Sequence, residues 1–288
     1  MPIARTVLLL NVDLYCTREG EGPPLIVHHG GPGLDHTVIQ PHLKPLAEHM
    51  EVICFDHRGT GRSAPPQGTA NPYHIDGFVE DVGNLAEALG AQRFALMGHS
   101  FGGIVATMFA LAHPERVTYL ILVCTPPSDQ FVADVEAALP GRLTAEALAD
   151  LKGLEDSEPS GEVIRRSLEL LAPIYFHDPD RVAELGLEEV RFGPATQAAW
   201  DSLEGFDLLP SLSQIDAPTL VIAGTDDATC WPARAKEMAE ALPNGQLLVI
   251  EDCGHYPFVE APEAFVSGVQ EFLGFKVKKR GLFGRRSS

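Results

Sequence analysis

The segment G-H-S-F-G-G at residues 98–103 constrains the fold of this chain more than any other feature. It follows the apolar run of residues 94–97 and precedes a helix-like segment, residues 104–112. A sharp strand-to-helix turn holds its central residue in a strained backbone, so the positions beside that residue must lack bulky side chains. The sequence therefore predicts that Ser100 lies exposed at such a turn, as a nucleophilic serine requires.

Two backbone amides are expected to stabilise negative charge near Ser100. The amide of Phe101 lies at the start of the helix, where N–H groups have no partner within the helix. A second glycine-rich turn, H-H-G-G-P-G at residues 28–33, follows the apolar run 25–27, and we assign the other amide to Gly31. No Gly-Lys-Ser/Thr follows this turn, so it is not a phosphate-binding P-loop. A plain loop is the remaining alternative.

An acid and a base are expected after the last two apolar runs. Asp226 and Asp227 follow residues 218–223, and His255 follows residues 246–251. Histidine suits a general base because its pKa lies near neutral pH. The sequence therefore predicts that Ser100, one aspartate and His255 form a triad for acyl transfer, which needs no cofactor.

These motifs and their order along the chain resemble those of the α/β-hydrolase superfamily. The resemblance covers nearly the whole chain. The resemblance includes D-H-R-G-T-G-R-S at residues 56–63, and G-H-Y-P at residues 254–257 followed by Glu260 and Pro262. The narrower segment H-G-G-P-G, residues 29–33, resembles the signature of proline iminopeptidases, serine peptidases that remove N-terminal proline. The resemblance implies an α/β fold with a mostly parallel eight-stranded sheet flanked by helices, and hydrolysis of N-terminal prolyl peptides.

The resemblance also ranks the candidate acids. In the superfamily's G-x-x-D turn the fourth residue is catalytic, which selects Asp227 when the turn is counted from Gly224. The usual following proline is displaced by one position, to Pro232. Asp226 remains an alternative, as does Asp129, because some relatives place the acid near the end of the sixth strand. Arg58 and Ser63, in the turn at residues 56–63, are interpreted as structural.

Apolar strand-like runs alternate with helix-like segments, as in a mostly parallel sheet. The region between the runs ending near residue 124 and starting near residue 217 is instead helical and acidic, without a strand-like run. We therefore predict a core in two parts, residues 1–125 and 210–274, and an inserted helical cap at residues 126–209. Residues 275–288, which hold six basic residues and no acid, are predicted to be a basic flexible tail.

Composition argues against several classes of function. The net charge of −19 argues against nucleic acid or an anionic membrane as partner. No segment is apolar for long enough to span a bilayer, and residues 7–17 lack the pattern of a signal peptide. The five cysteines are widely spaced without a C-x-x-C pair, so neither a disulfide framework nor a zinc site is predicted. We expect a cytoplasmic protein acting on a small molecule or short peptide; its oligomeric state stays open.

A prolyl substrate would require a particular kind of pocket. Its free amine is cationic, so a carboxylate must lie near the scissile bond and be at least half-buried. We predict substrate contacts from Glu204, which lies near Trp200 in the cap, and from His29 at the mouth of the site. The other acids of the cap considered for this role are Glu155, Asp156, Glu158, Glu162 and Asp201.

Two alternatives to the peptidase stay open. The first is a small-molecule carboxylesterase, lactonase or C–C bond hydrolase with the same triad. The second is a ligand receptor that keeps the hydrolase fold with little turnover, because a fold alone does not fix a function.

Overall fold

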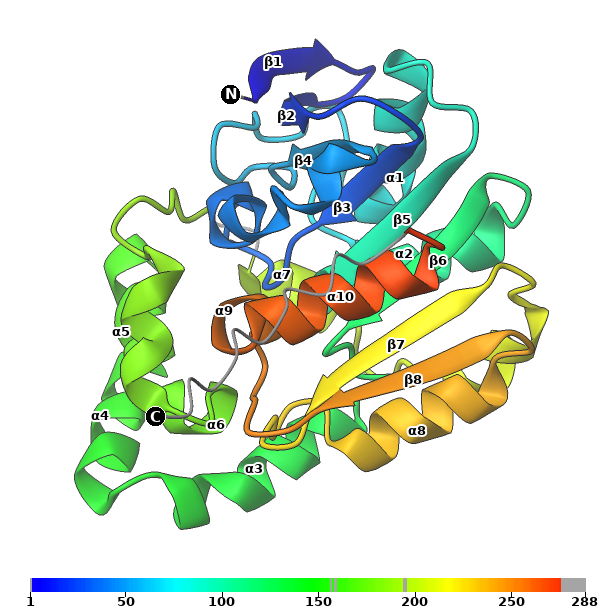
Figure 1. Ribbon diagram of the computed structural model, residues 1–288. Coiled ribbons are helices and arrows are strands. Elements are labelled where there is room, and N and C mark those ends of the chain that lie inside the picture. Colours follow the sequence, from blue (N-terminus) through cyan, green and yellow to red (C-terminus); the bar gives the residue numbers. More distant parts are fainter. Residues whose placement is uncertain (1, 156, 158–159, 194–195, 276–288) are drawn as a thin grey trace, which may run out of the picture.

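The computed structural model describes residues 2–155, 157, 160–193 and 196–275, and its strands form one eight-stranded sheet (Figure 1). The strand order across the sheet is β1-β2-β4-β3-β5-β6-β7-β8. The strands are β1 (Ile3–Leu8), β2 (Asp13–Glu19), β3 (Pro24–His28), β4 (Glu51–Phe55), β5 (Phe94–His99), β6 (Val117–Val123), β7 (Thr219–Gly224) and β8 (Gly245–Ile250).

Most neighbouring strands are parallel. β1 pairs antiparallel with β2, and β2 with β4, whereas the other five neighbouring pairs are parallel. The predicted fold class, a mostly parallel eight-stranded sheet flanked by helices, is therefore confirmed. Because the carboxyl ends of parallel strands meet at one edge of a sheet, the loops after β3, β5, β7 and β8 gather there.

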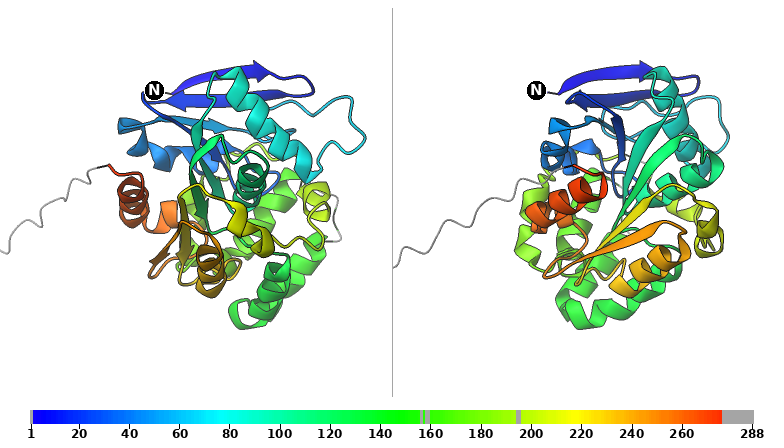
Figure 2. Two further views of the ribbon diagram at one scale, coloured as in Figure 1. Left: turned by 90° about the vertical axis from the view of Figure 1, so that its right-hand side faces the viewer. Right: turned by 45° about the vertical axis from the view of Figure 1, so that its right-hand side comes forward.

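Helices and short 3-10 helices cover both faces of the sheet (Figures 1 and 2). Side chains alternate along a strand, so β3 contributes Ile26 to one face and Leu25 and Val27 to the other. Ile26 belongs to a core shared with α1 (Ile75–Ala88), α2 (Phe101–Ala112) and α8 (Pro232–Ala241). The opposite core is completed by η1 (His36–Val38), η2 (Gln40–Leu43), η3 (Leu46–Glu48), α9 (Pro257–Glu260) and α10 (Pro262–Phe272).

The connection between β6 and β7 carries a group of helices, most of which lie at the left and along the bottom of Figure 1. Its described part contains one isolated β-bridge, which joins Ser128 and Asp207. Its elements are α3 (Gln130–Arg142), α4 (Ala145–Glu155), α5 (Gly161–Leu170), α6 (Ala172–Tyr175), η4 (Pro179–Leu185), α7 (Thr196–Asp201) and η5 (Leu209–Gln214). We call this connection, residues 124–218, the helical insertion.

Two further expectations from the sequence concern the basic C-terminal tail and membrane-spanning helices. The predicted basic tail falls almost entirely on residues 276–288, which lie outside the described residues. Among the helices that are described, none has the length and hydrophobicity needed to cross a membrane.

The turn at residues 56–63 is anchored by a buried ion pair. Arg58 is 2% exposed, and its Nε and Nη2 donate to the two carboxylate oxygens of Asp81 at 2.8 Å each. The guanidinium also donates to the carbonyl of Gly77 on α1. Ser63 Oγ donates to the carbonyl of Asp56 and accepts from the amide of Tyr15. These contacts join the turn to α1 and β2 and give it a structural role.

Replacing Asp81 by alanine should strongly destabilise the fold, because it leaves the Arg58 guanidinium buried without its counter-ion. We expect the free energy of unfolding in urea to fall by about 3–5 kcal/mol. Glu240→Ala is the control, since Glu240 forms an exposed i,i+4 pair with Lys236 and such pairs contribute little. Equal effects from the two substitutions would contradict the anchoring role.

Candidate active site

Ser100 lies at a strained turn between β5 and α2. Its backbone has φ 53° and ψ −121°, a conformation that non-glycine residues rarely adopt. The turn is possible because its neighbours are glycines: a Cβ on Gly98 would overlap the backbone of Gly102, and one on Gly102 would overlap the carbonyl of His28. The serine hydroxyl therefore stands at the carboxyl edge of the sheet, directly before the first amides of a helix.

The glycine-rich loop after β3 lies against this turn. A Cβ on Gly30 would overlap the ring of His99 and come within 3.3 Å of Ser100 Cβ. Gly31 has φ +54°, which glycine adopts at little cost, and it lines the same cavity as Ser100. Phe101 directly follows the serine and begins α2. Of the two residues expected to supply oxyanion amides, Gly31 therefore shares the cavity with Ser100 and Phe101 is its neighbour in the chain.

Asp227 and His255 are hydrogen-bonded to each other. The distance from His255 Nδ1 to Asp227 Oδ2 is 2.9 Å, and both side chains are almost completely buried. Asp227 Oδ1 also accepts from the amides of Thr229 and Cys230 and from the Thr229 hydroxyl. Burial alone would raise the pKa of Asp227, but the electrostatic interaction and hydrogen bond with His255, together with the two hydrogen bonds from Thr229, hold it below its ordinary value. Asp227 is therefore ionised and can orient the imidazole.

The backbone of His255 is fixed from two sides. Its amide donates to the carbonyl of Tyr175, at the end of α6, with an N–O distance of 2.6 Å. Its carbonyl accepts from Nε2 of His99 at 2.8 Å. Burial lowers the pKa of His99 to about 3, so this imidazole stays neutral. His99 thus supports the loop of His255.

The two alternative acids lie elsewhere. Asp226 is partly exposed and accepts from Nδ1 of His177 at 3.0 Å. Asp129 directly precedes α3, without a side-chain capping hydrogen bond, and its amide donates to the carbonyl of Phe206. Of the three aspartates, Asp227 is the one whose described contacts include His255.

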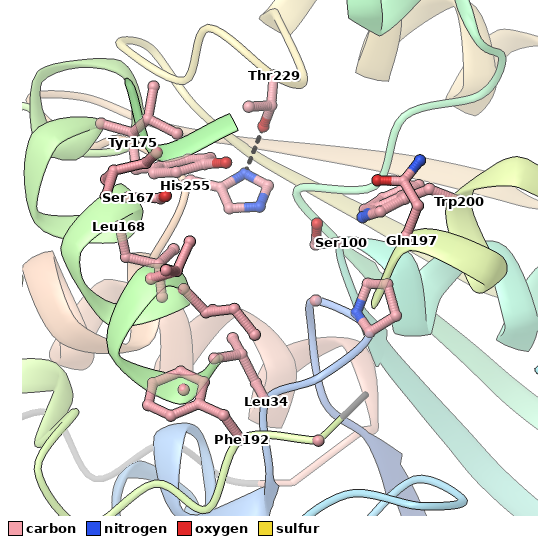
Figure 3. A pocket seen from close by; sticks show the side chains of 18 of the residues that line it. Leu34, Ser100, Ser167, Leu168, Tyr175, Phe192, Gln197, Trp200, Thr229 and His255 are labelled. Carbon is pink, nitrogen blue, oxygen red and sulfur yellow. Dashed lines mark hydrogen bonds between the residues drawn. The ribbon is translucent and has the colours of Figure 1, made fainter. Parts of the chain in front are cut away.

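Ser100 and His255 open into one cavity of about 700 Å³ (Figure 3). Figure 3 shows Leu34, Leu168 and Phe192 along one part of this cavity and Gln197 with Trp200 across from them. The helical insertion provides most of the wall. Its apolar contributors are Pro126, Phe131, Leu154, Val163, Ile164, Leu168, Leu171, Phe192 and Trp200.

The two predicted substrate contacts do not line this cavity. His29 is 1% exposed because its ring stacks on His57, with 3.4 Å between ring centroids, and accepts from the His57 amide. Burial also lowers the pKa of His29 to about 4, so it is a neutral packing residue. Glu204 is exposed, past the end of α7. We therefore correct both assignments.

The other acids considered as substrate contacts fall into two groups. Glu162 is exposed and pairs with Arg165, and Asp201 is exposed and accepts from Gln197. The Glu155 side chain, Asp156 and Glu158 lie outside the described structure. Among the described lining residues, none is an aspartate, glutamate, lysine or arginine.

Comparison with known proteins agrees with this architecture. A family model for the alpha/beta hydrolase fold matches residues 23–152 and 188–262. The chain belongs to the α/β-hydrolase fold family. It is 30% identical to a proline iminopeptidase of Lactobacillus delbrueckii subsp. lactis, over 91% of this chain and 95% of the relative.

The solved structures similar to this chain include a peptidase-related protein and an esterase. One is a proline iminopeptidase-related protein from Thermus thermophilus, with a TM-score of 0.77, 31% identity and coverage of 95% of this chain and 98% of the other. Another is a thermophilic esterase from Thermogutta terrifontis, with a TM-score of 0.72, 26% identity and coverage of 94% and 98%. A protein related to proline iminopeptidases and an esterase thus share this fold.

Glu260 has a role in this hydrolase that the sequence alone does not reveal. Its Oε2 accepts from the amide of Gly254, and its Oε1 accepts from the amides of His177 and Asp178. One carboxylate therefore ties the loop of His255 to the helical insertion. The sequence places Glu260 near His255, but the amides of residues 177 and 178 reach it only through the fold.

Within the described residues, two clusters each hold three side chains of types that can bind a metal ion. One is Cys124 with Asp227 and His255, and the other is Asp35 with His36 and Asp56. In each cluster the histidine Nδ1 bonds an aspartate. Hydrogen bonding explains both clusters, and we assign no metal. All five cysteines are buried and free, and burial raises the pKa of Cys253 to about 12, which leaves its thiol protonated.

Replacing Asp227 by asparagine should lower kcat about 10³–10⁴-fold, because an amide favours the wrong tautomer of His255. Asp226→Asn is the matched control on the adjacent position, and its kcat should remain close to that of the natural enzyme. Steady-state kinetics on any cleaved chromogenic substrate measures both variants. A larger loss from Asp226→Asn would transfer the orienting role to Asp226.

Proposed function

We propose that this chain is a serine hydrolase in which Ser100 is the nucleophile, His255 the general base and Asp227 its orienting acid. The observation that carries the proposal is the 2.9 Å contact between Asp227 and His255 at the cavity that Ser100 lines. His255 takes the Ser100 proton as the hydroxyl oxygen attacks a carbonyl carbon. The same proton then passes from His255 to the leaving group.

The negative charge of the tetrahedral intermediate would be stabilised by the amides of Gly31 and Phe101. Gly31 lines the same cavity as Ser100 and Phe101 follows it at the start of α2, and preorganised amides beside a nucleophile stabilise developing charge without reorganisation. Collapse of the intermediate leaves an ester on Ser100 Oγ. Water, deprotonated by His255, then attacks this acyl-enzyme, and His255 returns that proton to Ser100 Oγ as the acid leaves.

The substrate that we propose first is a peptide with N-terminal proline or a similar residue. The support is the similarity to proline iminopeptidases over most of the chain and the glycine-rich H-G-G-P-G loop beside Ser100. The scissile carbonyl would then belong to the N-terminal residue. Its cationic amine would require a carboxylate partner, and none of the described residues that line the cavity is an aspartate or glutamate.

A carboxylic ester with a neutral acyl group is the second candidate. It is favoured by the apolar side chains of the helical insertion that line the cavity, and by an esterase among the similar structures. Apolar walls contribute binding energy in proportion to the apolar area that they cover. They require no charge on the substrate.

A fluorophosphonate probe should label Ser100, because its phosphorus accepts the activated hydroxyl as a carbonyl carbon does. Peptide mapping by mass spectrometry should find the adduct on residue 100, and Ser100→Ala should abolish it. Turnover should fall by about 10³-fold or more in the same variant. An adduct on a different serine would overturn the assignment, and full labelling without turnover of any substrate would favour a receptor.

A substrate panel separates the two candidate reactions. The peptidase proposal predicts cleavage of a prolyl amide with a free amine, and a loss of about tenfold or more in kcat/KM when that amine is acylated, since a charge-assisted hydrogen bond contributes about 1.5–3 kcal/mol. Alanyl amides and short acyl esters complete the panel. Better cleavage of N-acylated substrates or simple esters would replace the peptidase with the esterase.

A further inference from the structure

We propose that Thr229 is a positioning residue whose hydroxyl holds His255 in the tautomer that can accept the Ser100 proton. The proposal rests on the triad put forward above and adds a fourth side chain to it. It concerns the same cavity, which Thr229 lines beside His255 (Figure 3).

The geometry places the Thr229 hydroxyl between the acid and the base. Its Oγ1 lies 2.6 Å from Asp227 Oδ1 and 2.7 Å from His255 Nδ1, while Nδ1 is 2.9 Å from Asp227 Oδ2. The position of Thr229 is fixed by its own amide, which donates to Asp227 Oδ1 at 2.8 Å. The residue is 8% exposed, so water competes weakly for these contacts.

Counting the protons assigns a direction to each contact. A threonine hydroxyl has one proton to donate and two lone pairs, whereas an ionised carboxylate only accepts. Asp227 is held ionised, so the hydroxyl donates its proton to Asp227 Oδ1. Its lone pairs then face His255 Nδ1, and a hydrogen on Nδ1 is shared between Thr229 Oγ1 and Asp227 Oδ2.

This arrangement selects one of two tautomers of His255. With two acceptors facing Nδ1, the neutral ring carries its hydrogen there, and Nε2 keeps the lone pair that takes the Ser100 proton. When His255 becomes an imidazolium during the reaction, Thr229 still accepts from Nδ1. Without the hydroxyl, Asp227 alone would orient the ring and would lose one of its donors.

Valine is the informative replacement because it is close to threonine in shape but has no hydroxyl. We expect Thr229→Val to react with a fluorophosphonate at Ser100 about 10–100-fold more slowly, as the loss of a hydrogen bond to a charged group implies. Thr229→Ser retains a hydroxyl and should remain within about threefold of the natural rate. Thr225→Val is the control, since the Thr225 hydroxyl bonds Asp226, outside the triad.

Labelling rates are measured together with the melting temperature, so that a loss of folding is separated from a loss of reactivity. Nitrogen-15 NMR of the histidine rings is the second measurement, and it should find the His255 hydrogen on Nδ1 in the natural protein at neutral pH. The proposal is overturned if Thr229→Val is labelled as fast as the natural protein, or if the valine and serine variants lose the same share of the labelling rate. It is also overturned if the hydrogen of the neutral His255 ring lies on Nε2. A natural protein that the probe does not label would instead refute the proposed triad itself.

Discussion

The close approach of backbone at the Ser100 turn is the constraint on which the rest of the structure depends. The positive φ of Ser100 is tolerated because α2 starts directly against β3, with glycines at the points of contact. The strain is balanced by burial, since Phe101 and Ile104 on α2 are fully buried in the core. A larger residue at Gly102 would separate the helix from the sheet and remove the serine from its position.

The second organising feature is the coupling between the histidine loop and the helical insertion. His255 is held by the carbonyl of Tyr175, and Gly254 is held by Glu260, which also binds the amides of residues 177 and 178. The insertion therefore supplies both the wall of the cavity and part of the support for the proposed base. This links the shape of the cavity to the geometry of the proposed triad.

The sequence predicts most of the fold because β3 to β8 contain short apolar runs and the Ser100 turn has a distinctive composition. It fails where the direction of a side chain depends on tertiary contacts. His29 adjoins the turn of Gly31, yet its ring stacks inward on His57. Glu204 belongs to the helical insertion but remains in solvent. Thr229 is two residues past Asp227, and only the fold brings its hydroxyl to His255.

The central claim is that Ser100, His255 and Asp227 act together beside amides that stabilise an oxyanion. A crystal structure of the protein after reaction with a fluorophosphonate tests it most directly. The account predicts phosphorus bonded to Ser100 Oγ, with the phosphoryl oxygen accepting from the amides of Gly31 and Phe101 and His255 Nε2 facing the adduct. An adduct on another residue, or a phosphoryl oxygen directed away from both amides, would contradict it.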